Sequence, residues 1–314
     1  MCVITDLVHG ADGMLFVTGY FDGTADVAGT DGGSAVLNSG SDNVAGFVAS
    51  YSNTGELIWA SNLTSTEERY PTCIGTYRTN VFVGGYFSDS GLFDIIFGNP
   101  GNQAFVARYD VAGNVVSESW EQTLESWDDD EFHYLVIDGT PVHVAGTFDS
   151  NATFVGPVAV GPEANLTNAG LTEAVVSKYA LVDGTPAWST SIGGPGMDQL
   201  IAIDTKDGFL YLAGSVENDA NFPGYGSLSG LVNEQICVAK IDNSTVNVEW
   251  ALSEGGFNSE LNKATDLEIT SDNQVVISGW YEDKAEFSGI APNKITTEGR
   301  SADPVVASYN TDGS

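Results

Sequence analysis

Basic residues are scarce in this chain: Lys and Arg together number 10, against 43 Asp and Glu, and the formal net charge is −33. A surface this negative repels phosphate backbones and anionic lipid headgroups, so nucleic acid and membrane surfaces are poor partners. No apolar run approaches the roughly 18 residues of a membrane-spanning helix, and no secretory leader is visible after Met1. We expect neither nucleic-acid binding nor membrane insertion.

Cysteine and histidine are equally rare, with three of each. The sequence has no CxxC motif and no Cys/His pair at ligand spacing, so a zinc site is not indicated. No GxSxG motif supports a Ser/His/Asp triad. Cys73 and Cys237 fall in apolar strand positions and are expected to pack as small hydrophobic residues, with a disulfide as the alternative. His143 takes a strand position that holds Phe in two other repeats, which predicts a structural role.

No sustained helical period is present, and the recurring pattern is instead a five-fold repeat. A block of the form apolar-Val-x-Gly followed by an aromatic or small residue recurs around Gly19, Gly85, Gly146, Gly214 and Gly279. These glycines are 66, 61, 68 and 65 residues apart. Three further blocks accompany each glycine block: an apolar strand before it, a strand of the FVASY type after it, and a tryptophan strand that closes four repeats. The tryptophans are Trp59, Trp120, Trp188 and Trp250.

Each repeat therefore predicts four short strands rich in Val, Ile, Phe and Tyr, separated by turn residues. One such sheet cannot bury both faces, and radial repetition lets each sheet cover the next. We predict an all-β fold: a β-propeller of four-stranded antiparallel blades, about five in this chain, filling residues 1–314. A string of separate β-sandwiches is the alternative, although about 64 residues a repeat is short for domains of about 100. The tryptophans are expected to pack between blades; a sugar-stacking platform is the other interpretation.

The expected blades cover approximately residues 1–62, 63–124, 125–192, 193–254 and 255–314. The last ends at the turn NTDGS and lacks its outer strand. An open edge invites pairing, so we expect the chain to be a piece of a longer one, with six to eight blades in the full ring, or another chain to supply a strand. A complete ring of five blades is the alternative. The long links between the second and third strands are expected to be variable loops and the likeliest contact surface.

A family resemblance is visible in AFVARYDVAGNVV (104–116), a tryptophan strand, and SIGGPGMDQLIAIDTKDGFLYLAGSV (191–216). These segments resemble the SBBP repeats, a bacterial-type β-propeller family, and the resemblance covers nearly the whole chain. It implies a secreted or surface protein in which the propeller is one module, and it transfers no catalytic residues. The GGPGMDQ element is clear only at 193–199 and is weaker at Glu254 to Gly256.

Two further features suggest ligands or modification. Four adjacent carboxylates, Asp128, Asp129, Asp130 and Glu131, are either solvated or bridged by calcium, which favours clustered oxygen ligands. No EF-hand pattern is present, and no cofactor is certain. Asn-x-Ser/Thr sequons, all in expected loops or turns, make Asn62, Asn151, Asn165 and Asn243 glycosylation candidates.

These observations lead us to expect a non-catalytic extracellular or cell-surface module with a structural, adhesive or assembly role. Its partners would be proteins or copies of itself. A lectin-like propeller that binds glycans is the alternative. A lyase or glycosidase sited in the central channel is less favoured, because convergent basic residues are scarce and fold does not settle function.

Overall fold

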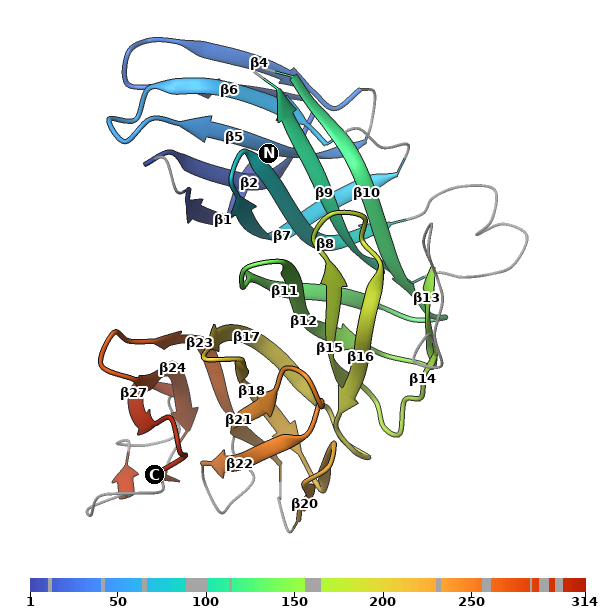
Figure 1. Ribbon diagram of the computed structural model, residues 1–314, viewed down its shortest axis with the longest axis vertical. Helices are drawn as coiled ribbons and strands as arrows, with labels where there is room; N and C mark the ends of the chain where they lie inside the picture. The colour runs from blue at the N-terminus through green and yellow to red at the C-terminus, as the bar shows by residue number, and fades with distance from the viewer. Residues whose placement is uncertain are drawn as a thin grey trace. The chain divides into compact units, whose positions relative to one another are not determined.

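The computed structural model in Figure 1 describes residues 1–10, 13–40, 43–63, 67–88, 101–112, 115–155, 165–229, 233–255, 261–282, 284–287, 294–296 and 302–314. Every regular element in these ranges is a β-strand, which confirms the all-β prediction. Within the same ranges, no helical segment has the length and apolarity needed to cross a lipid bilayer.

The chain forms two compact units. The division between them passes through the third sheet along the chain, whose strands are given below. Unit 1 comprises Met1–Val144, Ala152–Asn165 and Lys178–Trp188. Unit 2 comprises Ala145–Asn151, Leu166–Ser177 and Ser189–Ser314. Each unit is described by itself below.

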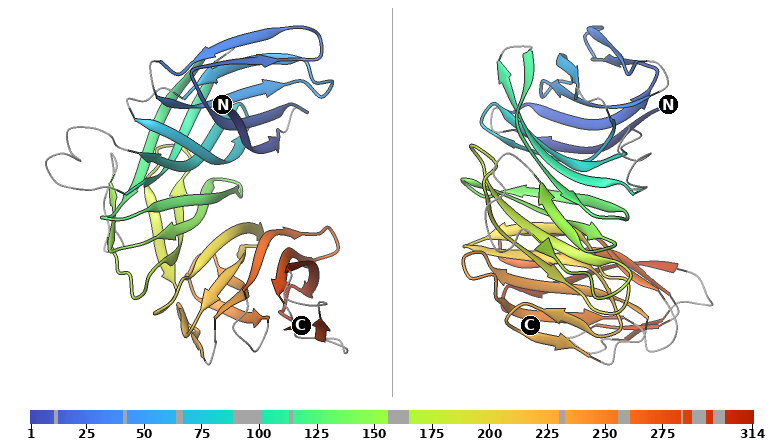
Figure 2. Two further views of the ribbon diagram at one scale, coloured as in Figure 1. Left: turned by 180° about the vertical axis from the view of Figure 1, so that it is seen from behind. Right: turned by 90° about the vertical axis from the view of Figure 1, so that its right-hand side faces the viewer.

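The first two sheets begin with the same meander of four antiparallel strands (Figures 1 and 2). The first holds β1 (Cys2–His9), β2 (Leu15–Asp22), β5 (Val44–Tyr51) and β6 (Leu57–Asn62). The second holds β7 (Glu68–Tyr77), β8 (Asn80–Ser88), β9 (Gln103–Ala112) and β10 (Val115–Glu125), extended by β13 (Ala152–Val155) and β14 (Asn165–Leu166).

The remaining sheets repeat this order. The third holds β11 (Asp130–Ile137), β12 (Pro141–Phe148), β15 (Glu173–Ala180) and β16 (Pro186–Ile192). The fourth holds β17 (Gln199–Lys206), β18 (Phe209–Glu217), β21 (Glu234–Asp242) and β22 (Val248–Glu254). The fifth holds three strands, β23 (Asn262–Ile269), β24 (Gln274–Glu282) and β27 (Ala302–Asn310). The predicted strand order within each repeat is therefore confirmed, and the described residues of the last repeat supply three strands of its sheet.

The prediction that the long links are loops was wrong for three of them. Each of these links contains a small two-stranded hairpin. The hairpins are β3 (Thr24–Ala28) with β4 (Ser34–Asn38), β19 (Ala220–Phe222) with β20 (Gly226–Leu228), and β25 (Lys284–Glu286) with β26 (Lys294–Thr296). In β3 and β19 every second residue is buried, and the hairpin of β3 packs Ala25 and Val27 against Phe47 of the first sheet. The link between β12 and β15 supplies β13, which pairs with β10.

The repeated glycine lies opposite a β-bulge in the first strand of its sheet. Four first strands are interrupted in this way, and the partner of the residue before each bulge is Gly19, Gly85, Gly214 or Gly279. A Cβ at any of the four would collide with a backbone carbonyl oxygen of that first strand. The repeat therefore keeps glycine here because only hydrogen fits between the two strands.

First strands of successive sheets lie side by side within each unit. In unit 1, β1 contacts β7, and β7 contacts β11; in unit 2, β17 contacts β23. At two of these contacts, an aspartate of one first strand accepts a hydrogen bond from the backbone of the next. Asp6 Oδ2 accepts from Ile74 N at 2.9 Å, and Asp204 Oδ2 accepts from Ile269 N at 2.9 Å. Neighbouring sheets are thus joined along their first strands without sharing a ladder.

Candidate interaction faces of the sheets

Each sheet has two faces that pack differently. We call forward the face that carries Val48 in the first sheet and its equivalents in the others. We call rear the face that carries Ile74 in the second sheet and its equivalents. In unit 1 the forward residues Phe16, Val48 and Trp59 share one core with rear residues such as Ile74. In unit 2 forward Val238 shares a core with rear Leu267. The same kind of contact, forward face on rear face, thus occurs in both units.

The tryptophan strand contributes a repeated contact to the forward face. Trp120 Nε1 donates to Leu181 O at 3.2 Å, and Trp250 Nε1 donates to Thr311 O at 3.2 Å. Both carbonyls belong to the turn that follows the third strand of the neighbouring sheet. Glycine in that turn leaves room for the indole, since a Cβ at Gly184 would lie 2.7 Å from the Trp120 ring. The prediction that the tryptophans pack between sheets is confirmed at these two.

A cation lies beside the indole in the same two sheets. Arg108, paired with Trp120 across the strands, donates to Leu181 O at 3.2 Å and to Val182 O at 2.8 Å. Lys240, paired with Trp250, donates to Thr311 O at 3.1 Å. Arg108 and Lys240 therefore each bind carbonyl oxygens of a neighbouring sheet's turn.

The last sheet leaves its forward face uncovered. Val306 is 72% exposed. The valines in the equivalent position of the other sheets are fully buried: Val48, Val106, Val176 and Val238. The valine position that the other sheets bury is therefore exposed in the last sheet, on the same face as the exposed carboxylates of Asp266 and Glu268.

The first sheet leaves the rear side of β1 uncovered. Ile4 is 65% exposed and Leu7 is 60% exposed. The equivalents of Leu7, identified by their pairing opposite the glycine strand, are Ile74, Ile203 and Leu267, and all are buried. The two uncovered faces are of opposite kinds, one forward and one rear. Sequence reasoning missed both faces, because a strand sequence does not show whether its neighbour is present.

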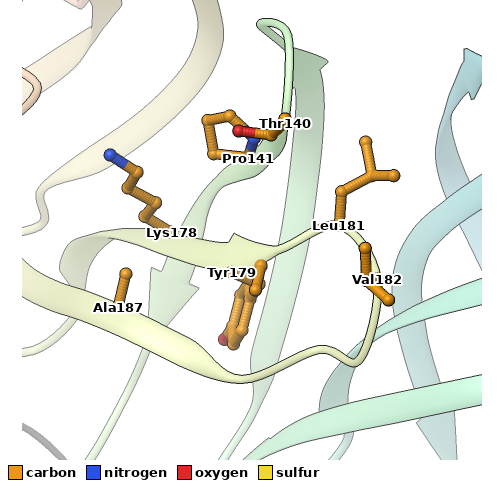
Figure 3. A pocket seen from close by; sticks show the side chains of 8 residues that line it. Thr140, Pro141, Lys178, Tyr179, Leu181, Val182 and Ala187 are labelled. Carbon is orange, nitrogen blue, oxygen red and sulfur yellow. The ribbon is translucent and has the colours of Figure 1, made fainter.

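A shallow pocket of about 310 Å³ lies on the third sheet within unit 1 (Figure 3). Thr140 and Pro141 form one side, and Leu181 and Val182 form another, with Lys178 at its edge. Burial lowers the pKa of Lys178, and Asp138 opposes that shift. Lys178 occupies the same repeat position as Arg108 and Lys240, which bind backbone carbonyls. The pocket therefore does not by itself indicate a small-molecule ligand.

The predicted calcium residues are held in several separate contacts. Asp129 Oδ1 accepts from Asn102 N at 2.9 Å, and buried Asp130 accepts from Ser126 Oγ at 3.0 Å. Glu131 lies 3.6 Å from His133 Nδ1, while Asp128 is exposed. No group of three or more His, Cys, Asp or Glu able to hold a metal ion occurs in the described residues. Calcium binding at this run stays a prediction.

Asp130 and Asp198 occupy the same kind of position, at the head of a first strand. Asp198 is buried, and it accepts from Gly194 N at 2.8 Å and from Glu217 N at 3.0 Å. Burial raises the pKa of Asp198 to about 6, and the carboxylates of Glu173 and Glu217 act in the same direction. The GGPGMD element thus wraps its loop around a buried carboxylate, which is an anchoring role.

The sequons differ in how accessible they are. The prediction that all four lie in loops or turns was wrong for Asn62 and Asn165, which end β6 and begin β14. Asn62 is half-buried, and its Nδ2 donates to Asn38 O at 2.7 Å, so the nitrogen that would carry a glycan is already bound. Asn151 and Asn165 are exposed, and Asn243 lies half-buried in a turn. Glycosylation itself stays a prediction.

The cysteines and His143 follow the expected pattern. Cys73 and Cys237 are buried free thiols, and Cys2 is an exposed one. Burial raises the pKa of Cys73 to about 12, so the thiol stays protonated and inert. His143 is buried, with its ring centroid 6.1 Å from that of Trp188, the partner expected for an aromatic at this position.

Comparisons with known proteins give little to add to this geometry. No protein-family model matches the chain, and no curated protein matches it. Among solved structures, Sqt1 from Chaetomium thermophilum is similar over 95% of this chain and 84% of its own, at 9% identity and a TM-score of 0.32. A mutant of B. megaterium levansucrase is similar over 96% and 88%, at 8% identity and a TM-score of 0.31. Likenesses this weak carry no argument, and the resemblance to SBBP repeats stays a prediction.

Proposed function

We propose that the chain is a β-propeller module with a non-catalytic structural, adhesive or assembly role at a cell surface or outside the cell. The side-by-side first strands within each unit support the propeller, because first strands line the axis in that architecture. Forward-to-rear packing in both units supports it as well. The sheets are then blades, and the five repeats lie around one axis.

The observation that carries the functional part is the pair of uncovered faces at Val306 and at Ile4 and Leu7. These residues are exposed at positions that the other sheets bury, which supports an interaction site at each of them. Both faces have the chemistry that this repeat uses to hold sheets together. The module therefore acts by packing against other protein surfaces.

The experiment has two parts. Electron cryomicroscopy or crystallography of the protein in its assembly should show five sheets around an axis lined by β1, β7, β11, β17 and β23. Sandwiches strung along a line would refute the propeller. Fluorescently labelled protein should bind to cells or extracellular matrix of its source, and V306R should bind less than Leu171→Arg, a change at an exposed leucine elsewhere. Equal binding by both variants would count against the role of the faces.

A second candidate, glycan binding, is favoured by one feature. Trp127 is 60% exposed and adjoins the exposed carboxylates Asp128 and Asp129. An exposed aromatic beside carboxylates is an arrangement on which sugars stack and form hydrogen bonds. A glycan array probed with and without calcium tests this candidate. Binding that is lost in Trp127→Ala supports it, and an array without signal contradicts it.

A further inference from the structure

Three tyrosine rings gather in unit 1, where the second strand of one sheet contacts the first strand of the next. Tyr20 of β2 lies edge-on to Tyr70 of β7, with ring centroids 5.1 Å apart. Tyr70 stacks on Tyr86, its partner across the strands, with centroids 4.9 Å apart and an angle of 11° between the rings. All three residues are half-buried, so part of this tyrosine stack is open to solvent.

Carboxylates lie beside the tyrosine stack. Glu68 accepts a hydrogen bond from the Tyr70 hydroxyl at 3.1 Å. Burial raises the pKa of Tyr86 to about 12, and the negative charge of Glu131 acts in the same direction from nearby. Glu131 lies 3.6 Å from His133 Nδ1, but burial lowers the pKa of His133 to about 4, so the imidazole is neutral near pH 7. The stack therefore lies in a region of negative potential.

The basic residue next to the stack in sequence does not neutralise this charge. Arg69 precedes Tyr70 in β7, so its side chain leaves the opposite face of the strand. Its Nη1 pairs there with Glu121 Oε2 at 2.6 Å, and its guanidinium carbon lies 4.8 Å from the centroid of the Phe105 ring. A cation that balances Glu68 must therefore come from elsewhere.

Unit 2 shows which cation the same level of the repeat accepts. Lys263 takes the position of Tyr70, one residue before the partner of the repeated glycine. Its Nζ lies 3.0 Å from Glu234 Oε1. Ser215, which follows the repeated glycine as Tyr20 does, donates to the same oxygen at 2.6 Å. The repeat thus has room at this level for a lysine ammonium bound to a carboxylate.

We propose that the tyrosine stack and Glu131 bind a lysine side chain of a partner protein, an inference that rests on the proposed assembly role. The lysine stem is apolar and packs on aromatic rings, and its ammonium has three N–H donors for hydroxyl and carboxylate oxygens. An ammonium is also attracted to the face of a tyrosine ring. A metal ion such as calcium would use the carboxylates but not the rings.

The charge of the chain favours a partner as the source of the lysine. The chain has 10 basic residues against 43 acidic ones. Five of the basic residues already contact carboxylates or backbone carbonyls within their own unit: Arg69, Arg108, Lys206, Lys240 and Lys263. A basic partner is attracted to a molecule of net charge −33, whereas a second acidic chain is repelled.

The test is saturation-transfer NMR of the full chain with two short peptides, acetyl-Gly-Lys-Gly-amide and a norleucine counterpart that lacks the ammonium. The lysine peptide should bind, and the norleucine peptide should give no signal. Tyr86→Leu removes one ring and keeps an apolar side chain, so it should weaken lysine-peptide binding about two- to fivefold. Tyr225→Leu, at an exposed tyrosine of unit 2, is the matched control and should bind as the wild type does.

The carboxylate is tested in the same way. Glu131→Gln should weaken lysine-peptide binding about two- to fivefold, whereas Glu249→Gln, at an exposed position in unit 2, should not. Circular dichroism should show unchanged strand content, and if Tyr86→Leu unfolds, Glu131→Gln decides. Three outcomes would overturn the inference: no binding of the lysine peptide, equal binding of both peptides, or equal weakening by both glutamine variants. Displacement of the lysine peptide by an equal concentration of calcium would show a metal site instead.

Cell-surface binding separates this inference from the proposed function. Wild-type protein that binds cells or matrix but not the lysine peptide would leave the proposed function standing with a different contact surface. Protein that binds neither would remove both.

Discussion

Glycine at the centre of each second strand is required by the backbone of the strand beside it. At Gly214 a Cβ would collide with the carbonyl oxygen of Gln199, which cannot move without breaking the bulge. Such a collision with backbone differs from one with a flexible side chain, because the sheet has no alternative rotamer to adopt.

Gly214→Ala should therefore destabilise the protein by about 1–3 kcal/mol, the usual cost of overpacking a well-packed site. Ser253→Ala, a change of similar size in the same sheet, should alter stability by less than about 0.5 kcal/mol. Urea unfolding followed by circular dichroism measures both. Equal midpoints for the two variants would show that the bulge does not depend on glycine.

Asp198 is a single residue that makes the folding stability of the protein depend on pH. Its pKa of about 6 in the folded protein lies above the ordinary 3.8, so the folded state holds the proton more tightly than the unfolded state. The stabilisation from protonation is fully present below the unfolded pKa and is lost as pH rises through about 6. Burial of Glu173 raises its pKa and contributes with the same sign.

Asp198→Asn should therefore reduce the fall in unfolding free energy between about pH 4 and about pH 7. The variant should also lose stability overall, because an amide offers one acceptor oxygen where the carboxylate offers two. Asp207→Asn, at an exposed turn, should keep the wild-type pH profile. Urea midpoints measured across that range decide the matter, and a wild-type slope in Asp198→Asn would contradict the assignment.

The sequence predicts which strands pair within a sheet. It predicts only part of the contacts between sheets. Five glycine blocks and four tryptophans were enough to predict the strand order of each repeat. The hairpins were missed because strands of three to five residues carry too short an alternation. Their signal is Ala-x-Phe at Ala220 and Ala285 and Ala-x-Val at Ala25, with two buried residues flanking an exposed one at Ala25 and Ala220. The uncovered faces could not be predicted, because burial depends on a neighbouring sheet.

The tryptophan contact permits a direct test at the scale of elements. Trp120→Phe keeps the ring packing and loses the hydrogen bond to Leu181 O, so it should cost about 0.5–1.5 kcal/mol. Trp120→Ala also leaves a cavity and should cost about 3–5 kcal/mol. Trp127→Phe, at an exposed indole, should be near neutral. Urea unfolding followed by circular dichroism compares the three, and a neutral Trp120→Ala would refute a role between sheets.

At the scale of the whole molecule, a net charge of −33 opposes any association between copies. The proposed assembly role requires contacts that form in spite of this repulsion. Salt shortens the Debye length from about 30 Å at 0.01 M to about 3 Å at 1 M, which screens the repulsion and leaves apolar contact intact.

Self-association should therefore strengthen as sodium chloride rises from about 0.05 M to about 0.5 M. Sedimentation velocity at fixed protein concentration measures the shift from monomer to larger species. V306R should associate less than wild-type protein at every salt concentration, which separates a contact at Val306 from general salting-out. Association that weakens with salt would instead indicate a contact between opposite charges.

The sheet array has a direction, because the face each sheet offers differs from the face it accepts. A whole repeat of about 65 residues could consequently be duplicated or deleted without creating a mismatched junction, provided that the cut falls between equivalent positions. Length then becomes adjustable in steps of one sheet. A gene encoding this protein could grow by unequal crossing-over and still produce a chain in which each forward face packs on a rear face.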